Sequence, residues 1–118
     1  MSRPFRFGVQ LARLPSPGWP DALARLERLG YSSVLLPDHF GAQWDPLATL
    51  AGAAGVTRAL RLGTLVCDND FRHPVVLAKT AATIQALSNG RLELGVGAGW
   101  MISDYEQSGI PFDPIGVR

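Results

Sequence analysis

The stretch SNGRLELGVGAGW (residues 88–100) carries glycine at every second position from 95 to 99, where a β-strand gives way to a loop. Its middle part, RLELGVG (91–97), predicts a strand with two unlike faces. One face is apolar and the other holds charge and glycine: Leu92, Leu94 and Val96 against Glu93, Gly95 and Gly97. Central strands of an open parallel sheet are covered on both faces and usually read as continuous apolar runs. The pattern instead favours a strand that lines the interior of a barrel.

The rest of the chain alternates short apolar runs with segments of helical period. Strands are predicted over 5–10, 31–37 and 61–67, and FRFGVQ (5–10) repeats the two-faced pattern, with Phe5, Phe7 and Val9 opposite Arg6, Gly8 and Gln10. Helices are predicted from about Trp19, after Asp45, from Pro74 and over 101–109, with Gly30 and Asn89-Gly90 as stop signals. The apolar stripe of the first helix is Trp19, Leu23, Leu26 and Leu29. The third helix has Leu77, Ala81, Ile84 and Leu87 as candidate buried positions. The alternation predicts an α/β fold with parallel strands and right-handed crossovers, of barrel type rather than an open doubly wound sheet.

Composition excludes several classes of function. The length of 118 residues predicts one domain. The charges are nearly balanced, with 11 Lys+Arg and 10 Asp+Glu, and no run of like charge occurs. This balance predicts neither a nucleic-acid partner nor a membrane partner. Cys67 is the only cysteine, which excludes an internal disulfide and favours a reducing compartment. No stretch reads as a signal peptide or membrane span, so we expect a soluble, cytoplasmic protein.

Polar and glycine residues gather where three predicted strands end. Gly97 and Gly99 follow one strand, and their bare backbone either makes room for a flat ligand or permits close packing and a turn. Asp38 and His39 follow another strand, in LLPDHF (35–40). An imidazole beside a carboxylate can move a proton near neutral pH, although such a pair is also common in ordinary turns.

The third strand end, TLVCDNDFRHP (64–74), brings Asp68, Asp70 and His73 close together in sequence. Their spacing matches no common metal site, so we expect loop and cap residues and no metal. His73, directly before Pro74, is expected to fix the start of the third helix.

Three segments carry a family resemblance: PDHF (37–40), LRLGTLVCDNDFRHPVVLAKTAATIQALSNGRLELGVGAGW (60–100) and YEQSGIPFDP (105–114). Together they resemble the N-terminal half of the luciferase-like monooxygenase superfamily, and specifically its branch of oxidoreductases dependent on the deazaflavin coenzyme F420. The resemblance implies a (β/α)8 TIM-type barrel of which the first four β-α units are present, a half-barrel. It also implies that a flavin-type ring lies in the barrel mouth and exchanges a hydride with a small organic substrate.

The resemblance also implies residue roles. Asp38 and His39 match the catalytic pair, with His39 as proton donor or substrate contact. Cofactor-binding positions are Leu65, Val66 and Cys67, with a non-proline cis peptide at Leu65-Val66 behind the ring, and Gly97, Ala98 and Gly99 at its border. Trp100 replaces the acidic catalyst of the family's sugar-phosphate dehydrogenases, so a different substrate is expected.

Length leaves further alternatives open. A full barrel takes about 250 residues, and its phosphate-binding loops typically follow strands seven and eight. The chain is therefore expected to be a fragment completed by a C-terminal half, a half-barrel that pairs with a second copy, or a domain rearranged on its own, with the fragment favoured. The functional alternatives are a monooxygenase dependent on flavin mononucleotide (FMN) and an inactive half-barrel that only binds ligand or assembles with a partner.

Overall fold

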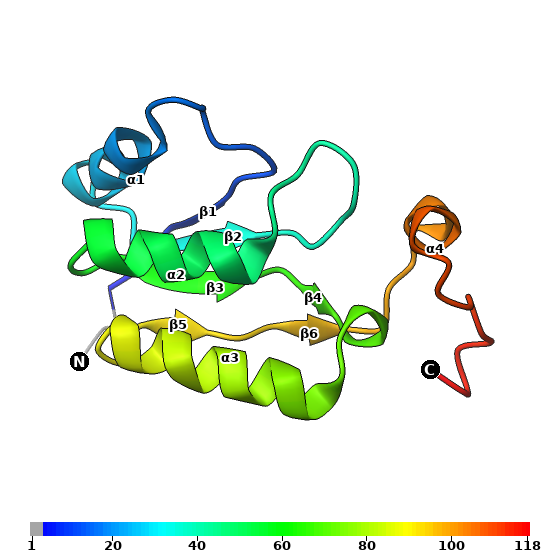
Figure 1. Cartoon of the computed structure of the whole chain (residues 1–118). Coiled ribbons are helices and arrows are strands. Elements are labelled where there is room, and N and C mark those ends of the chain that lie inside the picture. Colours follow the sequence, from blue (N-terminus) through cyan, green and yellow to red (C-terminus); the bar gives the residue numbers. More distant parts are fainter. Residues whose placement is uncertain (1–3) are drawn as a thin grey trace.

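The computed structural model describes residues 4–118 as short parallel strands with helices packed against them (Figure 1). The strands are β1 (Gly8–Gln10), β2 (Ser33–Leu36), β3 (Arg61–Thr64), β4 (Cys67–Asp68), β5 (Leu92–Glu93) and β6 (Val96–Gly97). The helices are α1 (Trp19–Arg28), α2 (Pro46–Val56), α3 (Pro74–Leu87) and α4 (Ile102–Ser108), with a 3-10 turn, η1 (Asn69–Phe71), after β4. The predicted α/β alternation is confirmed.

The sheet topology is that of consecutive β-α units in a barrel. The main sheet has the order β1-β2-β3-β5, and every pair in it is parallel. A second parallel pair, β4-β6, continues β3 and β5 beyond an interruption. The carboxyl ends of the strands therefore meet on one side of the molecule, where α4 also lies (Figure 1).

The predicted continuous strands over 61–67 and 91–97 are each split in two. The Leu65-Val66 peptide is cis, as predicted, and it separates β3 from β4. Near this interruption, the Thr64 hydroxyl replaces the backbone hydrogen bonds of the sheet. It donates to the Gly95 carbonyl at 2.8 Å and accepts from the Gly95 amide at 3.0 Å. The side chain thereby bridges the two halves of the interrupted sheet.

The core lies between one face of the sheet and helices α1 to α3. It includes Leu23, Val34, Leu36, Leu47, Leu50, Leu62, Leu77 and Ile84. Alternate residues of β2 and β3 enter this core, as the period-two pattern requires. None of the helices within residues 4–118 is long and apolar enough to cross a lipid bilayer.

Some expected core positions are wrong. Leu29 and Leu87 are exposed because Leu29 follows the last residue of α1 and Leu87 is the last residue of α3. Phe5 and Phe7 are exposed because the first strand begins only at Gly8. Leu94 and Val96 are also exposed, at 39% and 49%: Leu94 lies between β5 and β6, and Val96 lies on β6, which has a partner on one side only.

The helix boundaries follow the predicted signals. The Asp45 side chain caps α2 by accepting from the Ala48 amide at 2.7 Å, and Pro46 follows at the first helical position. Gly30 and Asn89-Gly90 adopt the left-handed conformation after α1 and α3.

The turn between α2 and β3 is fixed by two charged side chains. Glu27 Oε1 accepts from the amides of Arg58, Ala59 and Leu60 at 2.6 to 2.8 Å. Arg91 donates to carbonyls at the end of α2 and in the same turn. Burial by itself raises the pKa of Glu27, but the three amide donors and nearby Arg91 outweigh it, so this pKa is lowered.

Candidate active site

A hollow of about 270 Å³ lies at the carboxyl ends of β2, β4 and β6. We call it the strand-end hollow; it is lined by Asp38, His39, Leu65, Val66, Asp68, Gly97, Ala98, Gly99 and Trp100. The structure thus brings together all the predicted site residues except Cys67. The Cys67 side chain is fully buried in the core, where burial and the nearby Asp38 raise the pKa of its thiol.

His39 is held by a carboxylate that sequence reasoning missed. Its Nδ1 lies 2.7 Å from Oδ2 of Asp104 on α4, and the Asp104 side chain is only 4% exposed. The second oxygen, Oδ1, accepts from the Phe40 amide at 3.1 Å. The indole of Trp100 meets the His39 ring edge-on, with centroids 5.8 Å apart. The neighbouring Asp38 is therefore not the partner of His39.

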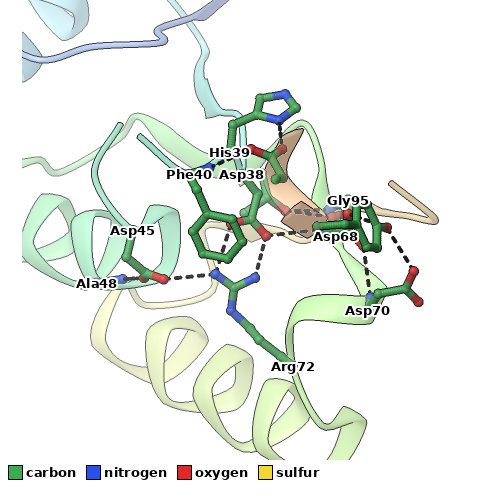
Figure 2. Close-up of polar contacts among 12 residues, drawn as sticks. Asp38, His39, Phe40, Asp45, Ala48, Asp68, Asp70, Arg72 and Gly95 are labelled. Atoms are coloured by element: carbon green, nitrogen blue, oxygen red, sulfur yellow. Dashed lines mark hydrogen bonds and ion pairs between the residues drawn. The ribbon is translucent and has the colours of Figure 1, made fainter. Parts of the chain in front are cut away.

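Asp38 instead belongs to a separate ionic cluster (Figure 2). Both of its oxygens accept from the Arg72 guanidinium, and Oδ2 also accepts from the Asp68 amide at 2.9 Å. Arg72 reaches on to Asp45 at 2.9 Å, and its hydrogen bond to Asp38 raises the pKa of the guanidinium. These contacts favour a positioning role for Asp38 at the end of β2, and a catalytic role for it stays a prediction.

Backbone forms much of the hollow around the cis peptide. Gln10 Nε2 donates to the Leu65 carbonyl at 3.2 Å, which ties β1 to this segment. A Cβ added at Gly97 would lie 2.5 Å from a methyl group of Val66. At Gly99, where φ is +69°, a Cβ would overlap the Tyr105 hydroxyl and the Asp68 carboxylate. Of the two explanations for these glycines, the structure therefore favours close packing, although both residues also border the hollow.

The Tyr105 hydroxyl links residues at the ends of β4 and β6. Its hydroxyl lies 3.1 Å from Asp68 Oδ2, 2.9 Å from Asp70 Oδ2 and 3.3 Å from the Ala98 carbonyl. Burial, followed by the hydrogen bond with Asp70, raises the pKa of Tyr105 to about 12. Adjacent residues of α4, Asp104 and Tyr105, thus tie the ends of β2, β4 and β6 together.

The loop after β4 has structural roles, as expected. Asp68 Oδ1 accepts from the Asp70 amide at 2.9 Å and caps η1, while His73 Nδ1 accepts from the Val75 amide at 3.2 Å and caps α3. Across residues 4–118, no group of three or more His, Cys, Asp or Glu side chains is arranged to hold a metal ion.

Asp104 and Arg72 had only weak signals in the sequence. Asp104 is an acidic residue in the first turn of the short helix that follows the glycine-rich strand. Arg72 stands among the charged residues of 68–73, and its partners lie 34 and 27 positions earlier. Neither spacing corresponds to a local motif, so only the fold reveals these pairs.

Comparison of the sequence with known proteins identifies related enzymes. A family model described as luciferase-like monooxygenase matches residues 19–114. The 4-hydroxyprotoasukamycin monooxygenase of Streptomyces nodosus subsp. asukaensis is 37% identical over 97 residues, which cover 79% of this chain and 26% of that protein. The F420-dependent glucose-6-phosphate dehydrogenase of Amycolatopsis mediterranei is 38% identical over 94 residues, which cover 72% of this chain and 28% of that protein.

Solved structures give the same picture. The coenzyme F420-dependent tetrahydromethanopterin reductase from Methanopyrus kandleri superposes with a TM-score of 0.78 and 28% identity, over 91% of this chain and 30% of that one. The monooxygenase RslO1 from Streptomyces bottropensis gives a TM-score of 0.76 and 28% identity, over 92% and 37%. These neighbours are luciferase-like barrel enzymes, and this chain spans 26% to 37% of the length of these four relatives.

Proposed function

Since this chain belongs to the luciferase-like monooxygenase family, we propose that it forms part of an oxidoreductase that transfers a hydride between coenzyme F420 and a small organic substrate. The strand-end hollow is the observation that carries the proposal, because it joins His39, the Leu65-Val66 peptide and the 97–99 segment in one place. Two relatives named as F420-dependent enzymes, at 38% and 28% identity, support this choice of cofactor.

The residues of the hollow suit a flat ring. The Leu65-Val66 segment and the 97–99 backbone offer a mostly apolar surface, and Trp100 is exposed beside it. At about 270 Å³ the hollow is smaller than most pockets for a complete ligand, about 300 to 1,000 Å³, so it would hold the ring and not the whole coenzyme. No lysine or arginine from residues 4–118 lines it, so the coenzyme's phosphate would be bound elsewhere.

Each hydride that moves between an alcohol and a carbonyl is accompanied by one proton. The bound deazaflavin would supply the hydride acceptor or donor, and His39 would take up or release the proton at Nε2. Leu65 and Val66 would back the ring, with Cys67 supporting them from the core, and Gly97, Ala98 and Gly99 would border it. Asp38, fixed by Arg72, would hold the 38–40 loop in place.

Trp100 bears on the substrate. Trp100 is 71% exposed at the edge of the hollow, and its indole meets the His39 ring edge-on. An aromatic wall beside the proton-transfer group favours an apolar or aromatic substrate over a phosphorylated sugar. The direction of hydride transfer is left open by this proposal.

A second candidate is an FMN-dependent monooxygenase that uses the same hollow. It is supported by the 37% identity to the Streptomyces nodosus monooxygenase. The third candidate is an inactive half-barrel that binds ligand or pairs with a second copy of the chain. A cytoplasmic location also stays a prediction.

Titration of the completed barrel that contains this chain with F420 and, separately, with FMN tests these candidates through the fluorescence of each cofactor. We expect F420 to bind more tightly. His39→Ala should change the Kd for the cofactor less than about threefold but abolish hydride transfer by the completed enzyme. His73→Gln lies outside the hollow and should leave both the Kd and the rate of hydride transfer unchanged. Tighter binding of FMN would favour the monooxygenase, and no binding of either cofactor would overturn the assignment.

A further inference from the structure

We infer that Asp104 is a positioning residue that selects the tautomer of His39, so that Nδ1 carries the proton and Nε2 presents a lone pair. The tautomer follows from the geometry of the protein itself. Only the use of the lone pair in proton transfer rests on the proposed function.

The two oxygens of Asp104 have separate partners. Oδ2 faces His39 Nδ1 at 2.7 Å, and Oδ1 accepts from the Phe40 amide at 3.1 Å. An ionised carboxylate can only accept hydrogen bonds, so the ring nitrogen opposite it must donate. The hydrogen bond at one ring nitrogen decides which of the two nitrogens is protonated. In the neutral ring, Nε2 is then left as the acceptor.

Within the part of the chain that the structure describes, no other group around His39 competes with Asp104 in setting the tautomer of the ring. The carboxylate is 4% exposed and the imidazole 23% exposed, so water competes little for their contact. Trp100 touches the ring edge-on and does not bond to its nitrogens. Among residues 4–118, the hydrogen bonds of His39 include none at Nε2. His39 itself lines the strand-end hollow, where the lone pair at Nε2 could accept a proton in the oxidative direction of the proposed reaction.

The second histidine of the chain provides an internal reference. His73 Nδ1 accepts from the Val75 amide at 3.2 Å, so its proton must lie on Nε2. The chain has two histidines in all. The structure therefore assigns opposite tautomers to them, Nδ1–H at His39 and Nε2–H at His73.

The variant Asp104→Asn should reverse the tautomer at His39. The Phe40 amide needs an acceptor, so the amide oxygen of the new side chain should face Phe40. Its NH2 group then faces His39 Nδ1, which must accept and lose its proton to Nε2. The reversal comes from the position of Phe40 N, and a merely structural role for Asp104 would not produce it.

The test is long-range ¹H–¹⁵N NMR of the full chain labelled at histidine nitrogens, at a pH where both rings are neutral. His73→Gln assigns the two sets of signals. We expect one Nδ1–H and one Nε2–H ring in the wild type, and two Nε2–H rings in Asp104→Asn. The matched control is Glu106→Gln, which removes the same charge from an exposed position of α4 and should leave the spectrum unchanged.

Two Nε2–H rings in the wild type would overturn the inference, and so would a folded Asp104→Asn variant that keeps Nδ1–H at His39. The wild-type spectrum decides the matter even if that variant does not fold. In the completed enzyme, Asp104→Asn should lower kcat for substrate oxidation, the direction in which Nε2 accepts the proton, by about 10²- to 10⁴-fold, the usual contribution of a positioned acid or base, while Glu106→Gln keeps it. If no cofactor binds, the proposed function fails, but the NMR result still stands or falls by itself.

Discussion

Arg72 offers the sharpest test of how the strand-end hollow is held together, because its guanidinium bridges one buried and one exposed carboxylate. The side chain of Asp38 is 6% exposed and that of Asp45 is 51% exposed. Among the donors that the structure describes in residues 4–118, Arg72→Met leaves Asp38 with the Asp68 amide alone. Removing one partner of a buried ion pair costs about 3–5 kcal/mol. Since Arg72 is 17% exposed and water can reach the site, we expect about 3 kcal/mol.

The two carboxylates should respond very differently. Asp45→Asn should cost about 0–1 kcal/mol, because exposed pairs contribute little and asparagine also caps helices well. Asp38→Asn should cost an intermediate amount, about 1–3 kcal/mol, since it loses charge-assisted hydrogen bonds but keeps an acceptor for the Asp68 amide. The double variant Asp38→Asn, Arg72→Met should lose less than the sum of the two single losses.

Urea denaturation followed by circular dichroism measures these differences. A loss of about 3 kcal/mol corresponds to a fall of about 1–3 M in the urea midpoint at the usual slopes. A loss below about 1 kcal/mol in Arg72→Met would refute the reasoning, as would equal losses in Asp45→Asn and Asp38→Asn. Either result would mean that the Asp38 carboxylate is solvated well enough to need no partner.

Three further predictions concern other parts of the chain. The lowered pKa of Glu27 means that its stabilising effect is present above the ordinary carboxyl pKa, about 4.5, and is lost as the pH falls through the lowered value. Glu27→Gln should therefore lower the urea midpoint at pH 7, and its difference from wild type should shrink as the pH falls below about 4.5. The pKa of Tyr105, raised to about 12, predicts that stability falls as the pH rises from about 10 towards 12, and that Tyr105→Phe weakens this dependence. Finally, Gly95→Ala should destabilise more than Gly97→Ala, because a Cβ at 95 meets backbone oxygen and one at 97 meets a methyl group of Val66.

Each of these has a contrary outcome. A difference between wild type and Glu27→Gln that is the same at pH 3 and pH 7 would show that charge does not matter at that turn. Ultraviolet titration in which both tyrosines of the chain ionise near pH 10 would contradict the environment assigned to Tyr105. Equal urea midpoints for the two glycine variants would mean that the backbone near Thr64 shifts to accommodate a new Cβ as readily as the Val66 side chain does.

The elements of the fold were predictable because their signals are local. Asp45-Pro46 and Asn89-Gly90 mark the ends of helices through contacts within a few residues. The cis Leu65-Val66 peptide was predicted from the family resemblance and not from local propensity. The exposure of Leu29 was missed because a helical period does not tell at which turn the helix stops.

The site was only partly predictable, because its pairings are distant in sequence. The strand ends were located correctly, and so the hollow gathers the expected residues from three of them. The carboxylate next to His39 in the chain suggested a pair, yet adjacent residues of an extended segment point to opposite sides. Asp38 therefore turns to Arg72 while His39 turns to Asp104, 65 positions away.

The contacts that α4 makes through Asp104 and Tyr105 also bear on how the chain folds. His39 and Asp104 are 65 residues apart, and Asp68 and Tyr105 are 37 apart. The His39–Asp104 contact closes a longer loop than the pairing of neighbouring β-α units, so its loop-closure entropy is larger. During synthesis on the ribosome, the sheet with α1 to α3 can thus be in place before α4 emerges. The His39 ring can acquire the orientation set by Asp104 only after α4 has docked.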